Sequence, residues 1–297
     1  MKTQIPDALK AEVPQSKWGK ILLSTPVVMT VVATLLAGLA SSEMTRAQYD
    51  RSLAAQMQSK AGDQWGFFQA KKLRGALQRS TLDLLQATAA VRPLEAAALK
   101  PFGELDAKTL AALQKSELPE APVVVLDPNL KAALDAVESS QPEADIAGLL
   151  GAVKDQVLAD ALIAAKARAQ TFDAAISPIT RAVEQMDKAL ATGGTPDLTR
   201  DFTAARLRFT AARYDAEARL NQAIANALEL QVRKGNLSAE RHHRRSGRFF
   251  YGMLAAQAAV ITSTFSLAAQ KRSMLWTLAA AAGLAAIAFA TYVFFCV

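Results

Sequence analysis

The chain has two histidines, His242 and His243, and both follow Glu240 in the segment ERHHRRSGR (240–248). A glutamate and a histidine three positions apart share one face of a helix, and some helical bundles bind metal ions with such pairs. A metal site needs further carboxylates or histidines, and the chain has no third histidine. We therefore expect no metal here, and interpret the arginines of this segment as groups that bind lipid headgroups. These arginines are Arg241, Arg244, Arg245 and Arg248.

Other residue types that catalyse reactions are present without a catalytic arrangement. Acidic residues such as Glu143 and Asp155 have the spacing of solvated helix faces and show no acid–base pair. Gly193 and Gly194 lack the Lys-Ser/Thr of a phosphate-binding loop and are interpreted as a turn. The single cysteine, Cys296, excludes a disulfide within the chain. We expect no catalytic residue, no cofactor and no enzyme activity.

One further cluster, AGDQWGFFQAKK (61–72), combines aromatic, amide and charged side chains. Its candidate partner or packing residues are Asp63, Trp65, Phe68, Gln69 and Lys71. In the simpler interpretation the aromatic residues are buried and hold the first helix of a domain against its last helix. In the alternative they form a ligand-stacking or partner-docking site.

Three apolar stretches, 21–40, 249–269 and 274–297, contain no Asp, Glu, Lys, Arg or His. Twenty helical residues cover about 30 Å, the thickness of the hydrocarbon layer. Backbone groups in lipid need internal hydrogen bonds, so we expect three transmembrane helices. Only four residues separate the last two stretches, which therefore form an antiparallel hairpin. The first stretch is too long for a signal-peptide core, and a tail of twenty residues precedes it.

The expected spans carry small and polar residues that suit packing in lipid. Ala279 and Gly283 lie four positions apart, and small residues let helix backbones approach closely. Gln257 offers a polar group for a hydrogen bond between helices. Because ion pumps usually keep ionisable residues at mid-membrane, their absence argues against active transport.

Charge indicates both the partner and the orientation. The net charge of +7 suggests nucleic acid, but the basic residues cluster beside the apolar spans. We therefore expect membrane lipids as partners and no nucleic acid. The basic tail, 1–20, and the short basic link between the last two spans favour a cytoplasmic N-terminus and an extracytoplasmic domain. Basic residues on the domain side are more numerous, but long domains cross membranes largely regardless of charge.

Residues 41–248 carry the periodicity of a long helical domain. In its first helix, Leu77 and Leu84 lie seven apart on the expected packed face. Between 146 and 190, steps of 4, 3 and 4 predict one helix with an eleven-residue repeat. That repeat comprises Ile146, Leu150, Val153, Val157, Ala161, Ala164, Arg168, Phe172, Ala175, Ile179, Val183, Met186 and Leu190.

The boundaries of these helices follow from turn residues. Gly193 and Gly194 end one helix, and Thr195 and Pro196 begin the next. The segment 92–141 is predicted to be an irregular insertion with short helices and one extended stretch, VVVLD. The expected fold is therefore all-α: three transmembrane helices plus a long antiparallel helical-bundle or coiled-coil domain outside the membrane.

The chain resembles a family of bacterial inner-membrane proteins catalogued only as a domain of unknown function. The resemblance rests on the motif D-x-W-x-x-[YF]-Q-A-K, present from Asp63 to Lys71, and on the two-span hairpin with its basic turn. It covers about 17–90 and 205–297, and the chain departs from the pattern between about 92 and 195. It implies a multi-pass protein of the bacterial inner (plasma) membrane, and it implies no activity.

Three functions are compatible with this architecture. The first is a non-catalytic scaffold or interaction protein, either homo-oligomeric or a subunit of a membrane complex. The second is a ligand-sensing helical ectodomain that signals through a separate partner. The third is a passive channel of oligomerised spans, for which the polar groups of 249–269 are the only support.

Overall fold

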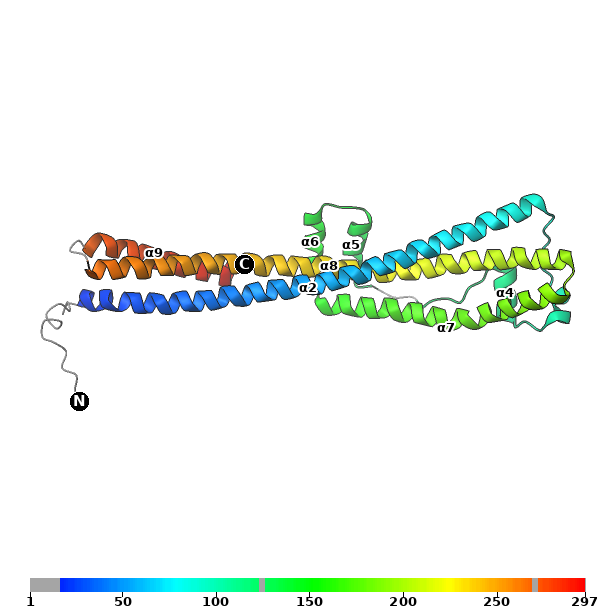
Figure 1. Cartoon of the computed structure of the whole chain (residues 1–297), viewed down its shortest axis with the longest axis horizontal. Helices are drawn as coiled ribbons and strands as arrows, with labels where there is room; N and C mark the ends of the chain where they lie inside the picture. Colours follow the sequence, from blue (N-terminus) through cyan, green and yellow to red (C-terminus); the bar gives the residue numbers. More distant parts are fainter. Residues whose placement is uncertain (1–16, 123–125, 269–271, 297) are drawn as a thin grey trace, which may run out of the picture. The chain divides into compact units, whose positions relative to one another are not determined.

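The computed structural model describes residues 17–122, 126–268 and 272–296, and every regular element in these ranges is helical (Figure 1). The predicted all-α fold is confirmed. The elements are α2 (Lys17–Thr88), α3 (Ala96–Leu99), the 3₁₀ helix η1 (Lys100–Phe102), α4 (Ala107–Lys115), α5 (Pro128–Glu138), α6 (Glu143–Ala152), α7 (Asp155–Gly193), α8 (Pro196–Ala268) and α9 (Arg272–Cys296).

The chain forms two compact units. The terminal unit comprises Met1–Leu53 and Gly235–Val297, and the central unit comprises Ala54–Lys234. Because α2 and α8 are long, each supplies residues to both units.

The terminal unit holds the apolar stretches of the sequence. Three helices are long and apolar enough to cross a membrane, within Leu23–Thr88, Pro196–Ser266 and Met274–Val293. Parts of α2, α8 and α9 lie side by side here (Figure 1) around a common apolar core. That core includes Met29, Leu36, Phe249, Ala256, Ala286 and Val293. Part of the expected link between the last two spans, residues 269–271, lies outside the described residues.

Small residues form the contact between α2 and α8 in both units. On α2 they are spaced by sevens, except at Phe68, and are buried: Ala33, Ala40, Ala47, Ala54, Ala61 and Gly75. On α8 the matching buried row is Ala204, Ala211, Ala218, Ala225, Val232, Ala239 and Ser246. Such heptad spacing keeps one face of a helix turned toward its neighbour.

The close approach of these two helices is visible at one pair in each unit. In the terminal unit, the Ser246 hydroxyl donates a hydrogen bond of 2.7 Å to the backbone oxygen of Ala40. In the central unit, a Cβ atom on Gly75 would lie 3.6 Å from the backbone oxygen of Ala211. Both contacts bring one helix to the backbone of the other, which only small side chains permit.

The expected packed face of the first helix is wrong. Leu77 and Leu84 are 56% and 64% exposed, and the buried face of α2 carries the small residues instead. The prediction placed the packed face on the leucines, because a leucine side chain can bury more apolar area than an alanine side chain. In this helix the buried alanines pack, whereas Leu77 and Leu84 point outward.

The predicted single helix with an eleven-residue repeat over 146–190 is also wrong. Helix α6 ends at Ala152, Val153 is extended with φ −80° and ψ 127°, and α7 begins at Asp155. The buried residues of α7 run in steps of four and three, as a heptad does. They include Leu158, Leu162, Ala165, Phe172, Ile176, Ile179, Val183, Met186 and Leu190. The expected Ala175 is exposed, because in an Ala-rich segment alanine does not mark the buried face.

The turn expected at 193–196 is confirmed. Helix α7 ends at Gly193, α8 begins at Pro196, and the Leu198 backbone N–H donates to Thr195 Oγ1 at 3.4 Å. A Cβ atom on Gly194 would lie 2.6 Å from the backbone oxygen of Leu190. The turn therefore requires glycine at 194 because of a close backbone contact.

The segment 92–141 contains α3, η1, α4 and α5. It also contributes to the core of the central unit, because Leu99 and Leu113 pack with Phe172 of α7 and Phe209 of α8. Helices α5 and α6 pack against each other (Figure 1). Val123–Val125 of the expected extended stretch lie outside the described residues.

We expect Gly194→Ala to lower the stability of the purified chain by about 1–3 kcal/mol, as overpacking typically does. The added methyl group would collide with the backbone of α7 and with Thr199 Oγ1, 2.8 Å away. Thermal unfolding followed by circular dichroism in mild detergent measures the effect. Gly193→Ala is the matched control, since its Cβ would meet only Phe102 Cε1 at 3.5 Å. Equal unfolding temperatures for the two variants would show that the turn tolerates a side chain at 194.

Candidate functional site

The motif residues of α2 do not share one environment. Trp65 and Phe68 are half-buried and meet edge to face, with ring centres 5.5 Å apart and planes at 87°. Asp63 and Gln69 are exposed, and Lys71 is half-buried. The aromatic pair lies at the edge of the buried face of α2. The charged motif residue that contacts α8 is Lys71, through an ion pair.

Lys71 belongs to a network of charges on α8. Its ammonium group forms an ion pair with Glu217, which also lies 3.4 Å from Arg213 Nε. The Tyr214 ring lies between the two cations, 5.4 Å from Lys71 Nζ and 4.9 Å from Arg213 Cζ. Cations so close to an aromatic face are attracted to it. The network therefore fixes the motif lysine to one turn of α8.

About two turns further along α2, Arg79 forms an ion pair with Asp215 of α8, and Lys72 lies 3.7 Å from the same carboxylate. The hydrogen bond from Arg79 and the positive charges of Arg79 and Lys72 hold the pKa of Asp215 below its ordinary value. The residues of this network are fixed charges that pair with one another, and they include no nucleophile with an adjacent base.

A second polar cluster lies in the terminal unit and was not expected from the sequence. Glu43 is only 8% exposed, and its Oε2 lies 2.5 Å from Nδ1 of His242. The other ring nitrogen of His242 lies 4.0 Å from Asp50 Oδ2, to which the Ser238 hydroxyl donates at 2.7 Å. Glu43 and Asp50 are seven positions apart, so the heptad spacing of α2 is the signal that places both on the packed face.

The two histidines differ in their surroundings. His242 lies between carboxylates of α2, whereas His243 is exposed and Glu240 pairs with Arg244 at 2.9 Å. Within the ranges that the structure describes, no three His, Cys, Asp or Glu side chains are arranged to hold a metal ion. The cluster places an imidazole of α8 between two carboxylates of α2.

The four arginines expected at lipid headgroups divide into two pairs. Arg241 and Arg244 are exposed. Arg245 turns inward and lies 3.9 Å from Glu43, and the Arg248 guanidinium lies over the ring of Tyr292 of α9 at 4.6 Å. The outer pair is therefore available to phosphates, while the inner pair holds helices of the terminal unit together.

The small residues expected to pack between spans are buried. Ala279 is 1% exposed, and a Cβ atom on Gly283 would lie 3.3 Å from Met29 Sδ. Gln257, in contrast, lies on the exposed face of α8. The contact of Gly283 with Met29 places α9 directly against α2 in the terminal unit.

Gly252 of α8 is a further packing residue that the sequence analysis did not single out. A Cβ atom there would lie 3.2 Å from both Leu36 Cδ1 of α2 and Phe289 Cβ of α9. Because it meets both neighbours at once, Gly252 is a position where α8 contacts both α2 and α9.

We expect acid to weaken the central unit through Asp215. A carboxylate whose pKa is lowered in the folded state stabilises the fold above its ordinary pKa, and the contribution disappears as the pH falls toward the lowered value. Below about pH 4 the native chain should lose stability faster than Asp215→Asn. Denaturant unfolding at pH 7, 4 and 3 measures this. The control is Asp83→Asn, which alters an exposed aspartate with no ion pair in the part described. Parallel losses in native chain and Asp215→Asn would contradict the prediction.

Comparison with known proteins gives one match. Residues 22–119 match the model of a family described as "Domain of unknown function (DUF4337)". The match includes the first apolar stretch and the whole Asp63–Lys71 motif, and it continues past residue 92, where we expected a departure. Neither a curated protein nor a solved structure matches the chain. The expected resemblance is confirmed over 22–119, about a third of the chain, and the family it points to has no assigned activity.

Proposed function

We propose that the protein is a non-catalytic helical scaffold, anchored in the bacterial inner (plasma) membrane by the terminal unit, whose central unit binds a second copy of itself. The observation that carries this proposal is a row of outward-pointing leucines on α2. Leu73, Leu77 and Leu84 are 63%, 56% and 64% exposed.

The position of these leucines excludes a role in the packing of α2 against α8. At about 100° per residue, Leu77 and Leu84 lie roughly opposite the buried Gly75 and Leu82. Exposed leucines in a row along one helix form a contiguous apolar stripe, and stripes of this kind mark interaction surfaces.

A second copy is the partner that this stripe fits best. Two parallel copies of one leucine row are self-complementary, as a two-fold interface requires. Because all copies are anchored in one membrane, their leucine rows lie at the same distance from that membrane. Other subunits of a membrane complex are the competing partners.

Membrane anchoring is supported by the surface of the terminal unit. Large apolar side chains are exposed on all three of its helices, among them Val27 on α2, Phe265 on α8 and Leu284 on α9. Water disfavours such a surface and lipid tails solvate it. In this proposal the exposed Arg241 and Arg244 contact the phosphates of lipid headgroups.

We expect Leu77→Cys, in a Cys296→Ser background, to give a disulfide-linked dimer as its major product. Cys296 is the only natural cysteine, so the background leaves a single reactive thiol. Mild oxidation of intact membranes followed by non-reducing electrophoresis measures the dimer. The control is Asp83→Cys, which is exposed on the same helix about 100° away from Leu84.

Equal dimer yields at positions 77 and 83 would indicate random collisions. A crosslink from position 77 to a protein of another mass would replace the homodimer with a second kind of subunit.

Asp83→Cys in the same background also tests the side of the membrane. With an extracytoplasmic domain, we expect a membrane-impermeant maleimide to label this cysteine in intact spheroplasts. Labelling that appears only after the membrane is permeabilised would place the domain in the cytoplasm.

A further inference from the structure

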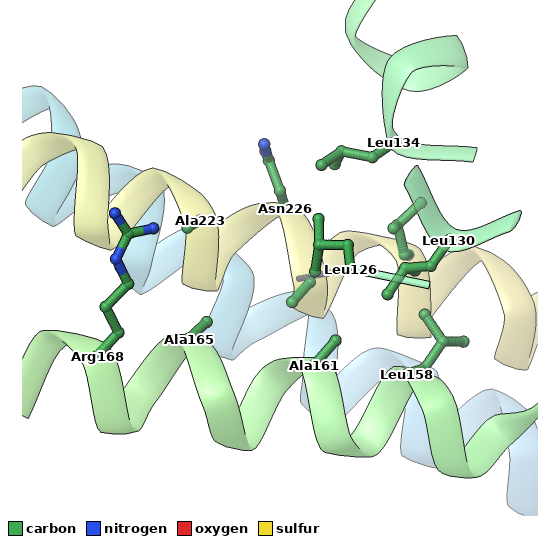
Figure 2. A pocket seen from close by; sticks show the side chains of 11 residues that line it. Leu126, Leu130, Leu134, Leu158, Ala161, Ala165, Arg168, Ala223 and Asn226 are labelled. Carbon is green, nitrogen blue, oxygen red and sulfur yellow. The ribbon is translucent and has the colours of Figure 1, made fainter. Parts of the chain in front are cut away.

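The central unit contains a hollow of about 120 Å³ between α7 and α8 (Figure 2). Its wall is apolar: Leu158 of α7, Leu130 and Leu134 of α5, Leu126 just before α5, and alanines of both long helices. Leu126 and Leu134 are only partly buried, so the hollow opens to the surface beside them. An apolar cavity of roughly 150 Å³ binds a benzene molecule, so this one accommodates about five or six carbon atoms.

Arg168 is the one charged residue in the wall. Its Nε atom is buried without a hydrogen-bond partner, as are the Nε atoms of several arginines of α8. Arg168 differs from these arginines because, within the described ranges, no carboxylate lies within 4.0 Å of its guanidinium. The arginines Arg206, Arg213 and Arg233 of α8, in contrast, each have an acidic partner. Among the residues that the structure describes, Arg168 is therefore a cation with no carboxylate close enough to form an ion pair.

The arrangement of these groups is linear. Figure 2 shows Arg168 and Leu158 at opposite ends of the hollow, both on α7, with Leu126 between them. Ten helical residues separate the two ends, which corresponds to about 15 Å. Asn226 also lines the hollow, but its side-chain amide donates to Glu138 at 2.9 Å.

We infer that this hollow binds a single-chain amphiphile with a carboxylate head, such as a fatty acid of medium length. The apolar wall takes part of the chain, and the rest follows the open side past Leu126. The carboxylate pairs with Arg168, because guanidinium and carboxylate form two parallel charge-assisted hydrogen bonds. This site is independent of the leucine row on α2, and it gives the proposed scaffold a ligand.

The probe is decanoic acid that carries a photoreactive diazirine near its methyl end. The full chain is reconstituted in lipid nanodiscs, because detergent tails would compete for the hollow. After irradiation, mass spectrometry of peptides locates the label. We expect labelled residues within 126–134, 155–168 and 223–230. A label confined to the terminal unit would indicate ordinary contact with bilayer lipid and would overturn the assignment.

Affinity measurements with decanoate and 1-decanol separate the two halves of the site. We expect Arg168→Gln to weaken decanoate binding about tenfold or more, as loss of a charged hydrogen bond does, and to leave 1-decanol unchanged. Arg168→Lys should retain part of the affinity for decanoate, since it keeps the charge. The matched control is Arg181→Gln, an exposed arginine of the same helix.

A second variant tests the hollow itself. Ala161→Phe places an aromatic ring in the space between Arg168 and Leu158, and should weaken both compounds equally. Circular dichroism of each variant checks that the helices are intact. Decanoate binding that survives both Arg168→Gln and Ala161→Phe would overturn the proposal, as would the absence of binding to the native chain.

Discussion

The close approach of α2 and α8 is the constraint on which the rest of the structure depends. Rows of small residues repeat every seven positions on both helices, so the two surfaces would match equally well after a slip of seven. Polar pairs remove this ambiguity. Glu43 meets His242, and a slip of seven along α8 would put Phe249 or Gly235 there instead. Lys71 would lose Glu217 in the same way. A charge left buried without a partner destabilises strongly, so these pairs fix the register that the alanines leave open.

Much of the fold follows from the sequence alone, and each failure has a physical cause. Apolar stretches without charge and the Gly-Gly-Thr-Pro turn are strong local signals: the first lie in helices long and apolar enough to cross a membrane, and the second ends α7 and begins α8. The packed face of α2 was missed because alanines make up much of it, whereas Leu77 and Leu84 point outward. The break between α6 and α7 at Val153 has no proline to mark it.

Local sequence patterns did not predict the contacts between segments that are far apart in the sequence. The motif lysine at 71 finds its partner 146 positions away, and no spacing rule within one helix indicates Glu217. Likewise the pattern around Glu240 drew attention to His243, while the histidine with partners on α2 is the half-buried His242. The heptad spacing of Glu43 and Asp50 was available in the sequence. It acquires meaning only when the neighbouring helix is known to be α8.

The same constraint explains why the outward leucines call for a partner. Leucines between α2 and α8 would hold the backbones further apart, and contacts such as Ser246 to the backbone of Ala40 would be lost. The small residues are thus required where they are, but nothing in the fold requires leucine at 73, 77 and 84. In the terminal unit exposed apolar residues occur on all three helices, as a lipid solvent demands, whereas on α2 of the central unit these three leucines follow one line. A helix bundle that exposes apolar residues on every side is suited to solvation by lipid, whereas a single row of exposed leucines is suited to packing against another helix.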